Sequence, residues 1–451
     1  MSAPPPYDDS SAQRLETNKD FAIDPSRSHS FALSWDFGAH APVDLDVQAL
    51  VVDFAGSIVD AAYYNNLKAC GRAVTHSGDE TEGKVPGIDE KVAIHFGRLP
   101  PNVQMVVVCV CCYTGGSFND VQGGLLQVLD EVSHTSVAKY PLGSNKGNAT
   151  AIILSALHCN ASQQSQPPSA RSWLIRPIDA PAQGRHFMDV LPAINGVIRQ
   201  MIPHAPSVQR VNFQMSKGSV VDFSSALPKI TCGLGWDTSF GTVDLDCSAV
   251  IFDTHANFLE AVFFGNLKSS APHSEAGAIS HSGDNLTGKG EGDDERVVIN
   301  LNALGPTVAQ VFFCINIYTN GVTFAQVANP YCRAEDGTQE LARYQLAEGA
   351  NARALIISKV ARDGHTGRWG FHALGVTSNG AMYKDCMGDM QRLFNTSTAT
   401  LAEASPMQVT AVQVTTTTGG GPVAPTSYAQ PVVQAQQQPP DAAKPKCCII
   451  L

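Results

Sequence analysis

The sequence lacks both a long hydrophobic run and an excess of positive charge. No stretch of about 18 consecutive apolar residues occurs, so no transmembrane helix is expected. The 451 residues carry a net charge of −11, which argues against nucleic acid as a partner. The first twenty residues are polar and rich in proline, without the apolar core of a secretory signal.

Several catalytic and metal motifs are missing as well. No repeated C-x-x-C pair is present, which excludes the usual structural zinc sites. Without a signal peptide, most of the twelve cysteines are expected to be reduced and buried. The G-x-S-x-G, H-E-x-x-H and P-loop patterns are absent, and no nucleophile stands with a matching base. The sequence therefore predicts a protein that is not an enzyme.

What the sequence does contain is a tandem repeat. The run HSGDETEGKVPGIDEKVAI (76–94) matches HSGDNLTGKGEGDDERVVI (281–299) without a gap, and VVVCVCCYTGG (106–116) matches VFFCINIYTNG (311–321). Ordered matches of this kind indicate an internal duplication. The predicted organisation is a disordered N-terminal segment (1–27), a diverged first domain called copy one (28–202), a second domain called copy two (207–395), and a flexible tail rich in threonine, proline and glutamine (396–451).

The pattern of each copy predicts an all-β fold. VDLDVQALVVD and VDLDCSAVIFD alternate apolar and polar residues, whereas VQMVVVCVCCY and VAQVFFCINIY are continuous apolar runs typical of buried sandwich strands. Turn-forming residues separate these segments at short intervals. Residues 186–202 and, more weakly, 382–394 have helical periodicity. We therefore expect two tandem β-sandwich domains, each with a short C-terminal helix.

An acidic loop and a paired-aspartate strand suggest a cation site in copy two. Residues 284–295 read DNLTGKGEGDDE, and hard cations such as Ca²⁺ bind six to eight oxygen ligands. In a strand, Asp244 and Asp246 face the same side, so we expect Leu245 in the core and both carboxylates pointing outward, where they repel unless a cation lies between them. Asn266 can add an amide oxygen. The alternative is a set of solvated acidic turns.

Copy one keeps most of this pattern. It has the same aspartate pair and the same asparagine, but Val85, Pro86 and Ile88 replace Gly290, Glu291 and Asp293. The sequence therefore predicts weaker calcium binding in copy one. The histidine before each SGD run is expected to be a hydrogen-bonded structural residue.

Copy two resembles the TerD family from end to end, most specifically in its SGDNLTGKGEGDDE run. That resemblance implies a β-sandwich that binds calcium through acidic loops, in proteins of tellurite resistance and stress response that include slime-mould cAMP-binding proteins. The ligands it implies, together with backbone carbonyls of residues 288–292, are Asp244, Asp246, Asn266, Asp284, Asp293, Asp294 and Glu295. Their counterparts in copy one are Asp44, Asp46, Asn66, Asp79, Asp89 and Glu90.

The last residues fit a lipidation signal. Cys448-Ile-Ile-Leu matches the C-a-a-X pattern for prenylation, and Cys447 is a candidate for palmitoylation. Two lipids would hold the protein on the cytoplasmic face of a membrane in a eukaryotic cell.

Together these features predict a calcium-binding, non-enzymatic stress-response or signalling module tethered to a membrane. Its expected partners are calcium, the membrane and other proteins of a stress or signalling complex. Two alternatives remain open: a receptor for a small molecule such as a cyclic nucleotide, with structural calcium, and a hydrolase that uses the cation as a Lewis acid. Melting shifts with nucleotides would identify the receptor, and turnover of phosphoesters would identify the hydrolase.

Overall fold

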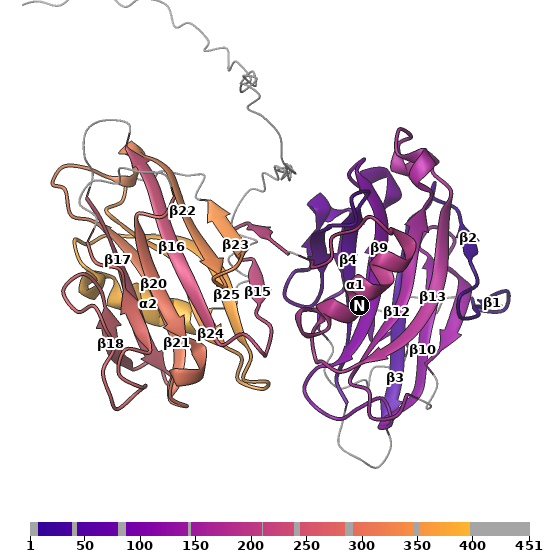
Figure 1. Cartoon of the computed structure of the whole chain (residues 1–451), viewed down its shortest axis with the longest axis horizontal. Helices are drawn as coiled ribbons and strands as arrows, with labels where there is room; N and C mark the ends of the chain where they lie inside the picture. Colours follow the sequence, from indigo (N-terminus) through magenta and orange to yellow (C-terminus); the bar gives the residue numbers. More distant parts are fainter. Residues whose placement is uncertain are drawn as a thin grey trace, which may run out of the picture. The chain divides into compact units, whose positions relative to one another are not determined.

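The computed structural model describes residues 8–37, 43–79, 87–142, 146–209, 211–238, 244–284, 292–345 and 351–396. Within these residues copy one is a pair of β-sheets (Figure 1). The first sheet has the order β1 (Gln13–Arg14), β11 (Thr135–Pro141), β10 (Val121–Asp130), β3 (His29–Phe37), β8 (Glu90–Ile94), β7 (Val74–His76) and β6 (Lys68–Ala69). The second has the order β2 (Phe21–Ile23), β13 (Trp173–Ala182), β12 (Ala151–Cys159), β9 (Val103–Cys112), β4 (Leu45–Asp53) and β5 (Ile58–Ala62).

Copy two repeats this strand order. Its first sheet runs β14 (Phe213–Met215), β23 (Glu340–Gln345), β22 (Val327–Glu335), β16 (Lys229–Thr238), β20 (Glu295–Asn300) and β19 (Ile279–His281). Its second runs β15 (Val220–Asp222), β25 (Trp369–Ser378), β24 (Ala354–Arg362), β21 (Val308–Ile317), β17 (Leu245–Asp253) and β18 (Phe258–Val262). The duplication seen in the sequence is thus a duplication of topology, and the all-β prediction is confirmed.

Each copy ends in the short helix that its sequence predicts. A 3-10 turn, η5 (Phe187–Asp189) in copy one and η8 (Tyr383–Cys386) in copy two, leads into α1 (Leu191–Met201) or α2 (Met387–Phe394). The other 3-10 turns are η1 (Cys70–Arg72), η2 (Phe96–Arg98), η3 (Ala161–Gln163), η4 (Pro168–Ala170), η6 (Leu301–Ala303) and η7 (Phe324–Gln326). In the described part of the chain, no helix combines the length and the hydropathy of a membrane span.

The C-terminal helix of each copy explains why central strands such as β9 and β21 consist of consecutive apolar residues. All ten residues of β9 are buried. In copy two, Met390 and Phe394 of α2 pack against Phe252 and Phe312 on the face of β17 and β21 that points away from the partner sheet. A strand covered by a sheet on one side and by a helix on the other has no face left for polar residues, so the period of two disappears.

The N-terminal segment differs from its prediction. Residues 1–27 were expected to be disordered, but β1 pairs in parallel with β11, and β2 pairs in antiparallel with β13. The ordered part of copy one therefore begins before residue 28. The two strands of this segment are too short for an alternation of apolar and polar residues to be recognised in the sequence. They form because they pair with edge strands of sheets built from residues far along the chain, and local composition does not predict such pairing. The tail after residue 396 lies outside the described residues.

Candidate metal centre

The DLD motif of each copy lies at the start of a central strand. Leu45 and Leu245 are fully buried in the core, as the sequence predicts. The neighbouring carboxylates differ from their prediction, because Asp46 is 0% exposed and Asp246 is 7% exposed. The two aspartates lie on the face of the strand opposite to Leu45 or Leu245, but neighbouring residues bury that face as well. Each copy thus holds a carboxylate that has been taken out of water.

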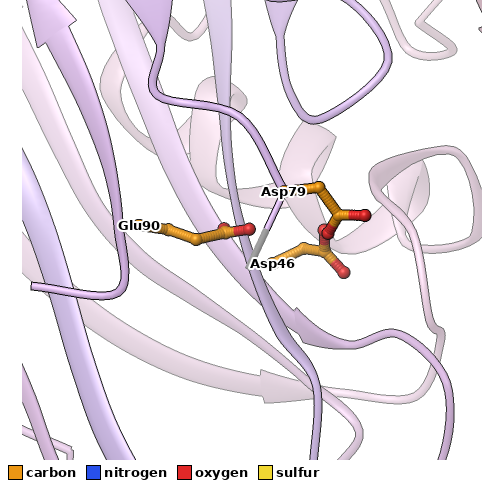
Figure 2. A group of neighbouring side chains, drawn as sticks. All are labelled: Asp46, Asp79 and Glu90. Carbon is orange, nitrogen blue, oxygen red and sulfur yellow. The ribbon is translucent and has the colours of Figure 1, made fainter. Parts of the chain in front are cut away.

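Three carboxylates converge in each copy. Figure 2 shows Glu90 of β8 pointing toward Asp46 of β4, where Asp79, from the segment after β7, meets it. Oxygen atoms of these three side chains lie within 4.8 Å of one another. In copy two, Asp244, Asp246 and Asp284 meet under the same 4.8 Å limit. Folding therefore brings the aspartates of the DLD segment together with acids that lie more than thirty positions further along the chain.

The same backbone hydrogen bond, present in both copies, positions the glutamate beside each group of carboxylates. One carboxylate oxygen, Oε2, of Glu90 accepts a hydrogen bond from Val47 N at 2.9 Å, and that of Glu295 accepts one from Cys247 N at 2.8 Å. Each bond joins a strand of the first sheet to the strand of the second sheet that carries the DLD motif. The glutamate therefore links the two layers at the site.

The histidines support the loops that follow them. His76 Nδ1 accepts a hydrogen bond from Gly78 N at 3.1 Å, and His281 Nδ1 accepts one from Gly283 N at 3.1 Å. This leaves the ring proton on Nε2, which in His76 lies 2.9 Å from the carbonyl oxygen of Val47. The two side chains are fully buried. Both are hydrogen-bonded structural residues, as the sequence predicts.

Some carboxylate oxygens in the two groups of three lack a hydrogen-bond partner among the described residues, and burial raises the pKa of the central aspartates. Neither carboxylate oxygen of Asp46, nor Oδ1 of Asp244, has a hydrogen-bond partner among the described residues. Burial, reinforced by Glu90, Asp44 and Asp79, raises the pKa of Asp46 well above its usual range. Burial and the charge of Asp244 raise the pKa of Asp246 to about 7. Buried carboxylates of this kind are costly unless a proton or a cation joins them.

Four other predicted ligands form hydrogen bonds with backbone atoms and do not belong to the two groups of three carboxylates. Asp89 accepts a hydrogen bond from Trp35 N at 3.0 Å, and Asp294 accepts one from Trp236 N at 2.9 Å. The side-chain amide of Asn66 donates to the carbonyl oxygen of Ala61 at 2.6 Å. Asn266 makes the equivalent bond at 2.8 Å. These residues fix the ends of the loops around the site.

Asp293 has a different environment from the other predicted ligands. Its side chain is 0% exposed and accepts two hydrogen bonds from Arg333, at 2.7 and 2.8 Å. Tyr331 and Arg296 also donate to it, at 3.1 and 2.9 Å. Burial alone would raise the pKa of this carboxyl, but the Arg333 guanidinium outweighs burial and lowers it. Asp293 is therefore the anion of an ion-pair network on the first sheet of copy two.

We expect Asp293→Ala to lower the free energy of unfolding without calcium by about 2 kcal/mol, because it leaves the nearly buried Arg333 with fewer acceptors. Calcium affinity is expected to change little. Urea unfolding in chelator and calcium titration of the same variant measure the two effects, with Asp246→Ala as the matched control that should lose affinity. A variant with wild-type stability and no calcium site in copy two would instead make Asp293 a ligand.

Part of the predicted site lies outside the described residues. This holds for 80–86 in copy one and for 285–291 in copy two, which include most of the glycine-rich stretch expected to offer carbonyl ligands. It also holds for Cys447 and Cys448. Asp293 was predicted to be a ligand, and its pairing with Arg333 was not expected from the sequence. A signal was present, because Ile88 stands at that position in copy one, and an isoleucine is an unexpected replacement for a ligand.

The gathered carboxylates suit a hard divalent cation. Calcium binds carboxylate and carbonyl oxygens with flexible geometry, whereas transition metals prefer nitrogen and sulfur ligands. Within the described residues, no lysine or arginine forms an ion pair with Asp46 or Asp246. A cation held between the oxygens would remove the repulsion that burial intensifies. Each group thus offers oxygen atoms of the kind that hard divalent cations bind.

Comparison with known proteins places both copies in one group. The model of the TerD domain matches residues 20–164 and 211–386. The tellurium resistance protein TerZ of Serratia marcescens is 37% identical over 180 residues, which cover 37% of this chain and 89% of that protein. General stress protein 16U of Bacillus subtilis is 35% identical over 188 residues, covering 38% of this chain and 94% of that protein.

Two further comparisons fit the same pattern. The chemical-damaging agent resistance protein B of Clostridium acetobutylicum is 36% identical over 136 residues, which cover 29% of this chain and 93% of that protein. A crystal structure of a telluride-resistance homologue from Streptomyces coelicolor aligns at 23% identity with a TM-score of 0.32, covering 37% of this chain and 98% of that one. The three relatives compared by sequence therefore each correspond in length to about one copy.

Proposed function

The chain belongs to the TerD family, with the domain present twice, and from this premise we propose that it is a calcium-binding protein of the stress response with one cation site in each copy. The family is one of tellurium resistance, chemical-damage resistance and stress response. The single observation that supports calcium is the buried carboxylate of Asp46, whose oxygens have no hydrogen-bond partner in the described part of the chain although two further acids converge on it.

The proposed ligands are a reduced version of the predicted set. Copy one offers Asp46, Asp79 and Glu90. Copy two offers Asp244, Asp246 and Asp284. Asp44 and Glu295 lie beside these groups and raise the pKa of the neighbouring aspartates, so they add to the negative potential that attracts the cation. Backbone carbonyls of residues 288–292 stay predicted ligands of copy two, and most of these residues lie outside the described part of the chain.

Weaker calcium binding in copy one stays a prediction, but one of its three grounds changes. The prediction depends on Val85, Pro86 and Ile88, which replace Gly290, Glu291 and Asp293. Since Asp293 is already neutralised by Arg333, its replacement removes no oxygen from the site. The structure thus gives no reason for copy one to bind less tightly at that position.

Calorimetric titration of the full chain with calcium tests the proposal. We expect two bound ions, and one in each of the variants Asp46→Asn and Asp246→Asn. At neutral pH, binding should also release protons, because burial raises the pKa of Asp246 to about 7 and the cation competes with the bound proton. Titration in two buffers that differ in ionisation enthalpy measures this release. A chain that binds no calcium in either buffer would exclude the proposal, and magnesium serves as the control cation.

The proposed role is sensing or buffering rather than turnover. No catalytic residue is assigned, and the absence of enzymatic activity stays a prediction. The membrane attachment and the small-molecule receptor also stay predictions. The lipidation cysteines lie outside the described residues.

A further inference from the structure

The two copies meet around a cleft of about 670 Å³. Copy one contributes Arg185 and Asp189 to its lining, and copy two contributes Arg362 and Arg368. The ion pair between Arg368 and Asp189, at 2.7 Å, joins the two walls. Small-molecule sites in proteins have volumes of about 300–1,000 Å³ and are common where two domains meet. The tandem arrangement therefore forms a cleft of ligand size that needs both copies.

Arg362 is a cation in this cleft without an anionic partner. It is the last residue of β24, and its guanidinium lies over the ring of Trp369, 4.7 Å from the ring centroid. The side chain forms no hydrogen bond or ion pair with another described residue, and its Nε atom is buried without an acceptor. Burial lowers the pKa of the guanidinium, because no acid offsets the loss of water around it. An anion in the cleft would supply the missing acceptors.

Arg185 is a second cation whose charge is not neutralised. Its terminal nitrogens donate to the carbonyl oxygens of Cys112 at 2.8 Å and Gly116 at 3.3 Å. These contacts fix the side chain on the wall of copy one, but carbonyl oxygens carry no formal charge. Arg185 forms no ion pair with a carboxylate of the described residues. The cleft thus has one unpaired arginine from each copy.

The charge of the cleft is opposite to the charge of the protein. Among the described residues, three arginines and one aspartate are the charged side chains that line it, so their net charge is +2 with histidine counted as neutral. The whole chain carries −11. Asp363 follows Arg362 but does not line the cleft, and its carboxylate accepts hydrogen bonds from Thr366 N at 2.7 Å and His365 N at 3.0 Å. A positive cleft of this kind raises the local concentration of small anions.

The lining also has an apolar part. Leu227, Leu301 and Trp369 contribute to it beside the charged residues. A cleft of about 670 Å³ is much larger than one inorganic ion, and apolar side chains suit the carbon skeleton of an organic molecule. The combination indicates a ligand with an anionic group and an organic body.

We propose that the cleft between the copies binds a small organic phosphate monoester. A phosphate monoester carries a charge of about −2 near neutral pH and has three acceptor oxygens on one group. The planar fork of an arginine matches these oxygens in a bidentate way, and Arg362 has its donors open. The aspartates and glutamate of the proposed calcium sites do not line the cleft, so either proposal can fail without the other.

Calorimetric titration of the full chain in calcium-free buffer tests the proposal, with ribose 5-phosphate and phenyl phosphate as probes. We expect one bound molecule per chain and no binding of ribose. Arg362→Gln should weaken the binding of both phosphate probes by about tenfold or more, because hydrogen bonds to a charged group are lost. Its melting temperature should stay close to that of the wild type, since this side chain has no polar partner in the described part of the chain.

Arg199→Gln is the matched control. It removes the same charge from an exposed side chain of α1 that does not line the cleft, so it should keep wild-type affinity. Three outcomes would overturn the proposal. A wild-type chain that binds neither phosphate probe has no such site. Equal loss of affinity in both variants would show a general effect of charge. Tighter binding of succinate than of either phosphate would make the ligand a dicarboxylate.

Discussion

Calcium at a hundredfold excess over its dissociation constant is expected to stabilise the folded chain by about 2.7 kcal/mol for each occupied site. The double variant Asp46→Asn, Asp246→Asn should lose this stabilisation completely. Both residues are buried carboxylates at the centre of their groups, so replacing the charged oxygen with an amide removes the strongest ligand of each site. Thermal unfolding with calcium and with chelator, for the wild type and the double variant, measures the effect.

The same variant should behave in the opposite way without calcium. Burial raises the pKa of Asp246 to about 7. A carboxyl with a raised folded-state pKa stabilises the protein fully below its unfolded pKa of about 4, and this contribution is lost as the pH rises through about 7. At pH 8 the wild type therefore carries the uncompensated charge, and the apo double variant should be more stable than the apo wild type. A calcium-induced shift in melting temperature that is equal in the wild type and the double variant would show that neither residue is a ligand.

The second large effect is expected at the contact between the two copies. Arg368 donates to Asp189 at 3.1 and 2.7 Å and to the carbonyl oxygen of Phe223 at 2.8 Å. The two charged side chains are 5% and 8% exposed. Asp189 also accepts hydrogen bonds from Ser225 N and Arg185 N, at 2.8 and 3.1 Å. Arg368→Met should lower the free energy of unfolding by about 3–5 kcal/mol, because it leaves a buried carboxylate without its cation.

The readout that identifies this contact is cooperativity. With the ion pair intact, the copies should unfold in one transition, and Arg368→Met should separate the unfolding of copy two from that of copy one. Differential scanning calorimetry detects the separation. Asp189→Asn, alone and together with Arg368→Met, completes a double-mutant cycle, in which the coupling energy isolates the pair from the packing around it. If the two substitutions change the free energy of unfolding additively and the chain still unfolds in a single transition, contacts other than this ion pair couple the two copies.

Much of the fold was predictable because its signals are local. Two matches without gaps between the copies show the duplication in the sequence. The strands are predicted by the alternation of apolar and polar residues and by continuous apolar runs such as the one that forms β9. The pairing of Asp244 with Asp246 on one side of a strand follows from the period of two alone. The short helices at the ends of the copies were also visible in the spacing of their apolar residues.

The structure shows that similar carboxylates in one motif have different roles. Asp293 and Asp294 are neighbours in the sequence, yet one is paired with Arg333 and the other accepts a hydrogen bond from the backbone of Trp236. The sequence shows that several acidic residues are close together in one loop. It does not show which arginine side chain or backbone amide of a distant strand contacts each of them. The identity of the partner decides whether a carboxylate is free to bind metal.

By itself the sequence determined the repeat, the sandwich strands and the acids from which a site can be built, because periodicity and spacing are properties of neighbouring residues. Only the tertiary structure decided that Asp46 is buried, that β1 and β2 complete the sheets, and that Arg368 meets Asp189 across 179 positions. It also decided that residues of copy two cover the Tyr63 edge of copy one, whereas Phe258 and Phe264 at the equivalent edge of copy two are exposed among the described residues. The physical reason is that burial and pairing depend on residues far apart in the chain, and their energies arise only when folding brings those residues together.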